Sequence, residues 1–161
     1  MDAGIKSEDS THSVPLSPEE VPYIALIEQL FFAYRDFTAD PDRILNRLDF
    51  GRAHHRALYF VARRPGMTVA ELLEILGITK QSLSRVLRQL VDAGYIRQHE
   101  GQSDRRQRLL FLTQAGHDLI LQLSQPQSRR IAKALEVCGN ENAQAVSAFL
   151  RAMTDKSPDG A

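Results

Sequence analysis

The chain has 161 residues and no formal net charge, because 20 Lys and Arg side chains balance 20 Asp and Glu side chains. A hydrophobic share of 43% and a charged share of 25% are typical of a globular protein and exclude wholesale disorder or a fibrous chain. No apolar run approaches the roughly 18 residues of a membrane helix, and the acidic start lacks the apolar core of a secretory signal, so we expect a cytoplasmic protein with no membrane partner.

The neutral total hides a segregation of charge along the chain. Residues 1–42 carry two basic and nine acidic side chains, whereas residues 79–108 carry seven basic and three acidic ones. Local basic stretches can bind a polyanion even in a protein of neutral isoelectric point. From the charge counts alone, the favoured interpretation is that these arginines are solvated on helix surfaces. The prediction of a function therefore depends on motifs.

The first 50 residues predict a flexible tail, residues 1–16, and then a long helix. Ser17 and Pro18, followed by two glutamates, predict that this helix starts at Ser17. Its two apolar stripes are Ile24, Ile27, Phe31 and Tyr34, and beside them Tyr23, Leu26, Leu30 and Phe37. Their combined width exceeds what one small core needs and favours a partner chain. The pair Asp40-Pro41 is predicted to break or restart the helix.

Three further helices are predicted between residues 51 and 94. The first covers residues 51–63 and ends at Pro65-Gly66. The second begins at a capping box formed by Thr68 and Glu71 and runs to about residue 76. The third begins at Thr79, ends at Gly94, and has an apolar face made of Leu83, Val86, Leu87 and Leu90. Two helices joined by so tight a turn are a helix-turn-helix candidate.

The remaining residues predict a β-hairpin and two helices. Residues 95–100 and 108–112 have strand character and flank a polar, arginine-rich tip. Thr113 is predicted to cap a long helix that Pro126 kinks or breaks. A last helix, from about Asn140, is predicted to place Val146, Phe149, Leu150 and Met153 on one face, before a tail at residues 155–161.

The polar face of the helix that follows Thr79 is the clearest sign of function. Opposite its leucines lie Gln81, Ser84, Arg85 and Arg88, with Lys80 and Ser82 at the flanks. No acidic residue lies between Glu74 and Asp92, although solvated helices usually include glutamates that pair with their cations. Ser, Gln and Arg side chains can read base edges, and arginine suits guanine. This face is therefore predicted to bind DNA.

The hairpin tip, Asp104-Arg105-Arg106, is a second basic element, directly after the helix-turn-helix. Long cationic side chains at such a tip can reach a minor groove or the phosphates. Asp104 would oppose DNA unless it holds one of these arginines in place.

In this order, the segments resemble the MarR family of bacterial multiple-antibiotic-resistance regulators. The resemblance rests on ITKQSLSRVLRQL, AGYI, the tip Asp104-Arg105-Arg106, and Leu112-Thr113 followed by Gly116. The run DFTADPDRILNRLDFGRAHHRALYF further suggests the PetP-like branch. The implied fold is mainly α with a small β-hairpin wing: a winged helix-turn-helix flanked by N- and C-terminal dimerisation helices. One domain would span residues 17–154, with dimerisation helices in 17–50 and 114–154 and a DNA-binding lobe in 51–113.

The resemblance also implies a function: a ligand-responsive homodimeric repressor that binds double-stranded DNA at a pseudo-palindromic operator. The predicted DNA-binding residues are Thr68, Thr79, Lys80, Gln81, Ser82, Ser84, Arg85, Arg88, Asp104, Arg105 and Arg106. Arg106 corresponds to the family's wing arginine and Asp104 to the acid that orients the wing. The alternative is a winged-helix module that binds protein and not DNA, against which the acid-free helix face argues.

A stripe on the predicted helix 51–63 is a candidate effector site. It consists of Arg52, His55, Arg56, Tyr59 and Arg63, opposite the core-facing Ala53, Ala57, Phe60 and Val61. Arginine, histidine and tyrosine together favour a small anionic or aromatic effector, through charge-assisted hydrogen bonds and ring packing. The alternative is a solvated basic face that assists phosphate contacts.

Other chemistry is predicted to be absent. His54 and His55 point about 100° apart on a helix and cannot readily chelate one metal ion. Cys138 is the only cysteine, so no intramolecular disulfide can form. We find no phosphate-binding loop, paired carboxylates or activated nucleophile, and expect no catalytic residue, metal or cofactor.

Overall fold

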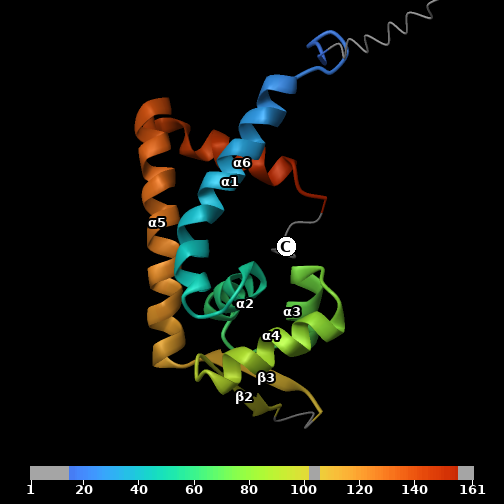
Figure 1. Ribbon diagram of the computed structural model, residues 1–161, viewed down its shortest axis with the longest axis vertical. Helices are drawn as coiled ribbons and strands as arrows, with labels where there is room; N and C mark the ends of the chain where they lie inside the picture. Colours follow the sequence, from blue (N-terminus) through green and yellow to red (C-terminus); the bar gives the residue numbers. More distant parts are fainter. Residues whose placement is uncertain (1–14, 102–105, 156–161) are drawn as a thin grey trace, which may run out of the picture. The chain divides into compact units, whose positions relative to one another are not determined.

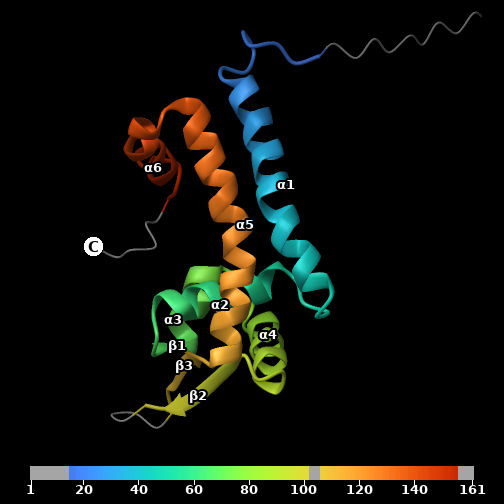
Figure 2. The same ribbon diagram turned by 90° about the vertical axis from the view of Figure 1, so that its left-hand side faces the viewer.

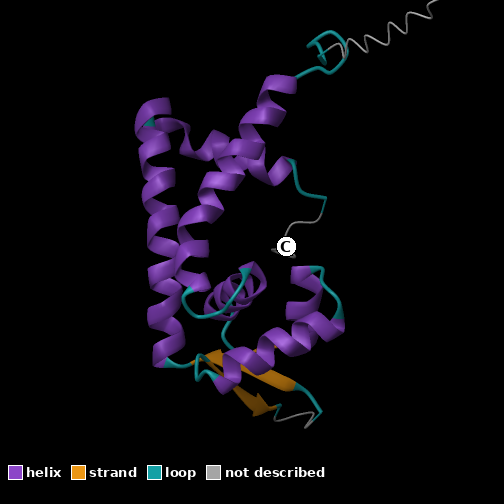
Figure 3. Cartoon of the chain, viewed as in Figure 1, coloured by secondary structure: helices purple, strands orange, loops and turns teal. Residues whose placement is uncertain are grey.

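A computed structural model describes residues 15–101 and 106–155 of the chain (Figure 1). Contacts divide the chain into two units, Met1–Arg35 and Asp36–Ala161, each of which is described by itself. Helices dominate, and the strands form one small sheet (Figure 3). The predicted mainly α fold with a β-hairpin wing is confirmed.

Helix α1, Ile24–Asn46, begins later than predicted. Ser17 forms the predicted local cap: its Oγ accepts a hydrogen bond from the Glu20 backbone N–H at 3.3 Å, and Glu20 Oε2 accepts one from the Ser17 N–H at 3.0 Å. The turn does not continue as a helix, because Pro22 lacks an N–H and Tyr23 adopts a left-handed φ of 63°. The predicted helix start at Ser17 is therefore wrong.

The predicted break at Asp40-Pro41 is also wrong, because Pro41 lies buried inside α1. A helical proline leaves the carbonyl four residues earlier without its N–H donor. Here the Phe37 carbonyl accepts a hydrogen bond at 3.2 Å from Nε2 of Gln127, on helix α5 (Gln114–Cys138). A side chain from another helix thus replaces the missing donor. Helix α5 also continues through Pro126, so a break there is excluded.

The helices of the winged-helix region follow the predicted boundaries closely. They are α2 (Arg52–Arg63), α3 (Val69–Leu76) and α4 (Lys80–Asp92). Helix α2 is central, since it contacts α3, α4 and α5, and Figure 2 shows it beside the first half of α5. The largest fully buried side chains of this core are Leu45, Leu58, Leu72, Leu83, Leu90, Ile96, Leu110 and Leu123.

The sheet has three antiparallel strands in the order β1-β3-β2. The predicted hairpin is confirmed as β2 (Ile96–Glu100) and β3 (Arg108–Leu112), in which Ile96 pairs with Leu112. Strand β1, Met67–Thr68, was not predicted; its buried Met67 pairs with Leu110 of β3. This pairing joins the start of α3 to the hairpin.

Thr113 joins the hairpin to α5 as predicted. Its Oγ1 accepts a hydrogen bond from the Gly116 N–H at 3.1 Å and donates one to the Gly94 carbonyl at 2.6 Å. Its backbone N–H donates to the Tyr95 carbonyl at 3.0 Å. The end of α4, the hairpin and the start of α5 therefore meet at one residue.

The chain ends in a 3₁₀ turn, Asn140–Asn142, and helix α6, Ala143–Ala152, close to the predicted last helix. The predicted tails lie outside the described residues, apart from residues 15, 16 and 155. None of the helices that the structure describes is long and apolar enough to cross a membrane.

Candidate nucleic-acid interface

The helix-turn-helix is held by two hydroxyl caps. Thr68 Oγ1 accepts a hydrogen bond from the Glu71 N–H at 3.2 Å and donates one to Glu71 Oε2 at 2.8 Å. The Thr68 backbone N–H also donates to Glu71 Oε2, at 2.7 Å. These hydrogen bonds from Thr68 favour the ionised carboxylate and lower the pKa of Glu71. Gly77 ends α3 in a left-handed conformation, which glycine adopts without a steric penalty.

Helix α4 starts at the second cap. Thr79 Oγ1 accepts a hydrogen bond from the Ser82 N–H at 3.2 Å and donates one to Ser82 Oγ at 2.9 Å. Three of the predicted DNA-binding residues, Thr68, Thr79 and Ser82, thus hold the beginnings of α3 and α4. Side chains in such positions suit phosphate contacts, which fix the register of a protein on a duplex.

The two faces of α4 separate as the helical wheel predicts. Leu83, Val86, Leu87 and Leu90 are buried in the core. Lys80, Gln81, Ser84, Arg85 and Arg88 are exposed. Within the described part of the chain, the three cations of this face form no ion pair. The face therefore presents hydrogen-bond donors and positive charge to any partner that approaches it.

The hairpin lies beside α4, and Figures 1 and 2 show both near the start of α5. Near its tip, Arg108 pairs with Glu100 at 2.9 Å, and the Gly101 N–H donates to the Gln107 carbonyl at 3.0 Å. Arg106 is exposed where the chain returns from the tip. Asp104 and Arg105 lie outside the described residues, so their predicted roles stay predictions.

A buried histidine connects α4 to α2. His54 is 8% exposed, and its ring stacks on Phe50 with centroids 4.6 Å apart. The Gly51 N–H donates to Nδ1 at 3.0 Å, so Nδ1 carries no proton and Nε2 donates to Gln89 Oε1 at 2.9 Å. The imidazole thus caps α2 and holds α4 at once. The hydrogen bond to Gln89 was not predicted, because the apolar pattern marks leucines and not pairs of polar core residues.

The predicted effector residues lie together on helix α2. Arg52 pairs with Asp42 at 2.8 Å, and Arg56 and Tyr59 are exposed. His55 is half-buried; burial lowers the pKa of its imidazole, against the attraction of the Asp42 carboxylate. Neither of the two pockets that we describe is lined by these residues.

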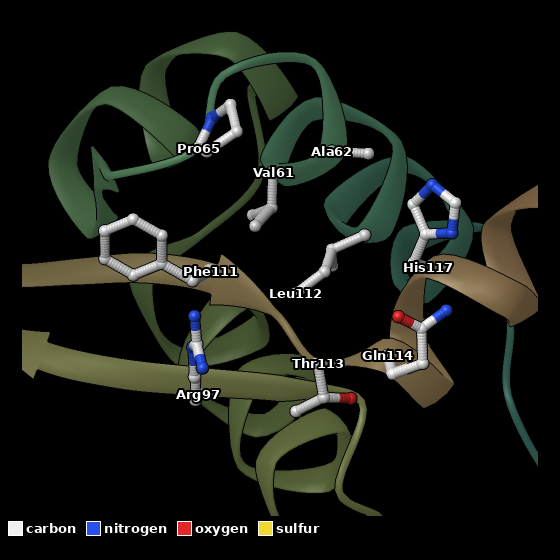
Figure 4. Close-up of a pocket in the computed structure, with 9 residues that line it drawn as sticks. All are labelled: Val61, Ala62, Pro65, Arg97, Phe111, Leu112, Thr113, Gln114 and His117. Carbon is white, nitrogen blue, oxygen red and sulfur yellow. The ribbon is translucent and has the colours of Figure 1, made fainter.

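One of these pockets lies at the root of the hairpin (Figure 4) and has a volume of about 450 Å³. Its walls come from the end of α2, from both strands of the hairpin and from the start of α5. Arg97 lies opposite Phe111 in the strand register, and its guanidinium carbon is 5.8 Å from the Phe111 ring centroid. The alternation of side chains along the two predicted strands is enough to predict that Arg97 and Phe111 are neighbours. The pocket itself could not be predicted, because its walls come from segments far apart in the sequence.

Metal ligands are not grouped in the described residues: no three His, Cys, Asp or Glu side chains lie close enough to hold an ion. Cys138 is exposed at the end of α5.

Comparison with known proteins identifies one family. A family model described as MarR family matches residues 48–107. The HTH-type transcriptional regulator PetP of Rhodobacter capsulatus is 50% identical over 129 residues, which cover 80% of this chain and 78% of PetP. This match confirms the PetP-like branch of the family, which residues 36–60 suggest.

Solved structures share the fold at lower identity. A mutant of MepR from S. aureus is 18% identical with a TM-score of 0.70, covering 80% of this chain and 94% of MepR. A mutant MarR from E. coli, complexed with operator DNA, is 21% identical with a TM-score of 0.63, covering 88% of this chain and all of that one. At these identities the likeness shows the fold.

Proposed function

The chain belongs to the MarR family of HTH-type transcriptional regulators, and from this premise we propose that it is a cytoplasmic, homodimeric repressor that binds a pseudo-palindromic operator. The exposed, acid-free face of α4 carries the proposal. Helix α4 would enter the major groove, where Arg85 suits the O6 and N7 of guanine. The caps at Thr68 and Thr79 would face phosphates, and Arg106 would reach the adjacent minor groove.

Exposed apolar rows support the proposed homodimer. The large apolar side chains that are exposed in residues 15–35 are Leu16, Tyr23, Leu26, Ile27, Leu30, Phe31, Phe32 and Tyr34, and those on α6 and its end are Val146, Phe149, Leu150 and Met153. Contiguous apolar rows of this kind mark protein interfaces. We assign residues 17–50 and 114–154 to dimerisation and 51–113 to the DNA-binding lobe. Light scattering on the purified chain tests this step, and a mass of one chain would overturn it.

Replacing Arg85 with alanine tests the readout. We expect operator affinity to fall about 10- to 100-fold, because a bidentate arginine–guanine contact discriminates by roughly 1–3 kcal/mol. Affinity for random duplex should fall much less, since phosphate contacts supply non-specific binding. Fluorescence anisotropy with both duplexes measures the two effects. The control is Arg151→Ala, which removes an exposed arginine of α6.

Equal losses on operator and random duplex would remove the assignment of α4 as recognition helix. The salt dependence of the same titrations tests the alternative of a protein-binding module. For a protein that binds DNA, the logarithm of the binding constant falls linearly with the logarithm of the salt concentration, because binding releases counterions from the phosphates. A flat dependence would therefore refute operator binding.

We also propose that Arg52, His55, Arg56 and Tyr59 contact a small anionic or aromatic effector. The exposed Arg56 and the half-buried His55 support it, with the Arg52–Asp42 pair beside them. An effector lowers operator affinity only if it prefers a dimer whose recognition helices are wrongly spaced. When benzoate is titrated into the operator complex, the wild-type protein should leave the operator at a lower benzoate concentration than the Arg56→Ala variant does. If Arg56→Ala keeps the response and lowers the salt slope of DNA binding, the stripe contacts phosphates instead.

A further inference from the structure

A cationic groove lies between the C-terminal half of α1 and the middle of α5. Its volume is about 690 Å³. The charged side chains that line it are Arg43, Arg47, Arg129, Arg130 and Lys133, with the single carboxylate of Asp40. None of them belongs to α4, to the hairpin or to the effector stripe on α2, so neither the proposed operator contacts nor the proposed effector contacts account for this groove.

The spacing of these cations is unfavourable for the helices themselves. Arg43 lies in the last turn of α1 and Arg47 in the turn directly after it, four residues on, while Arg129 and Lys133 lie four apart on α5. Like charges at this spacing are neighbours on a helix surface and repel each other. The two rows then line the same groove from opposite sides, which adds to the repulsion. A solvated helix face would normally carry acids at some of these positions.

Asp40 compensates only part of this charge. Its carboxylate is 3.1 Å from a guanidinium nitrogen of Arg130 and 3.4 Å from one of Arg43. One acid therefore holds an arginine from each wall of the groove. Arg47, Arg129 and Lys133 have no ion pair within residues 15–101 and 106–155. Among the described residues, these three cations of the groove therefore have no paired carboxylate.

The walls of the groove are held in place by contacts between α1 and α5. Gln127, two residues before Arg129, donates its hydrogen bond to the Phe37 carbonyl of α1. Pro41 and Leu45 of α1 are buried, as is Leu123 of α5. The two walls are therefore joined by the Gln127 hydrogen bond and by the Arg130–Asp40 ion pair, and four of the five cations lie on helices, so an anion that binds them does not have to organise a long loop first.

We propose that this groove binds a small anion that carries a diphosphate group. Arginine guanidinium groups bind phosphate oxygens through paired, charge-assisted hydrogen bonds, and lysine adds a point charge. Cations on both walls match more than one phosphate, and the volume exceeds what a single phosphate fills. None of the described residues that line the groove is aromatic, which disfavours a planar aromatic ligand of single charge.

Inorganic pyrophosphate, without a divalent metal, is the probe. Isothermal titration calorimetry of the full-length chain should give saturable binding with one site per chain. The midpoint temperature of thermal unfolding should rise as the site fills. Sodium chloride at matched ionic strength should not reproduce that shift. Removing Arg129 or Arg47 by alanine should weaken binding at least tenfold each, and their side chains are exposed, so the fold should survive.

Two matched variants separate this groove from the proposed operator contacts. Arg85→Ala removes a cation of the DNA-binding face and should leave pyrophosphate affinity unchanged, as should Arg151→Ala. Pyrophosphate binding that is absent, or that disappears only in Arg85→Ala, overturns the proposal. So does an Arg47→Ala, Arg129→Ala double variant that binds pyrophosphate as wild type does. If this double variant instead lowers the salt slope of duplex binding and the wild type ignores pyrophosphate, the groove contacts DNA and the proposal is wrong.

Discussion

Replacing Gly116 with alanine is expected to lower the free energy of unfolding by about 3 kcal/mol. Gly116 is buried in the first turn of α5, and a Cβ there would collide with the backbone carbonyl oxygen of Tyr95 and lie 3.0 Å from its carbon. The obstacle is backbone and cannot rotate away. The same carbonyl accepts a hydrogen bond from the Thr113 N–H at 3.0 Å, so moving it loses this bond as well.

Helix propensity alone predicts the opposite sign, because alanine is favoured over glycine inside a helix by about 1 kcal/mol. Urea unfolding followed by circular dichroism, at one protein concentration, decides between the two. The control is Gly51→Ala, where nothing lies within 4 Å of the added Cβ and φ is −121°; its cost should stay below about 1 kcal/mol. A Gly116→Ala variant as stable as wild type would show that α5 moves away from the hairpin at little cost.

The parts of the fold that the sequence predicts correctly are those that local chemistry decides. Thr68, Thr79 and Thr113 each accept the hydrogen bond that a helix start requires, so their helices begin where the residues indicate. The face of α4 was predictable for a similar reason. Its leucines repeat at the helical period, which leaves only one side for Gln81, Ser84 and Arg85.

The wrong and missing predictions concern contacts between residues far apart in the chain. Pro41 stays inside α1 because Gln127, 86 residues later, donates to the freed carbonyl of Phe37. Strand β1 has two residues, too few for any alternation, and exists because β3 pairs with it. The cationic groove draws its charges from residues 40–47 and 129–133, which are more than 80 residues apart in the chain. No window of sequence contains both halves of such an arrangement.

Replacing His54 with alanine is the other change for which we expect a loss of about 3 kcal/mol in the free energy of unfolding. The substitution removes the ring that stacks on Phe50 and opens a cavity between α2 and α4. It also leaves the Gly51 N–H and the Gln89 side-chain oxygen without their partner. His54→Phe keeps a flat ring but loses both hydrogen bonds, so its cost, about 1–3 kcal/mol, reports the polar part.

A double-mutant cycle isolates the bond that holds the recognition helix. If His54 Nε2 and Gln89 position α4 together, the loss of unfolding free energy in the double variant His54→Phe, Gln89→Ala should be about 1 kcal/mol smaller than the sum of the two single losses. Operator affinity should also fall in each single variant. The control is His55→Ala, the neighbouring half-buried imidazole, which forms no such bond to α4. Additive stability losses with unchanged operator affinity would contradict the coupling. In that case His54 only fills space in the core. The four buried apolar side chains of α4 would then be enough to fix the orientation in which this helix meets DNA.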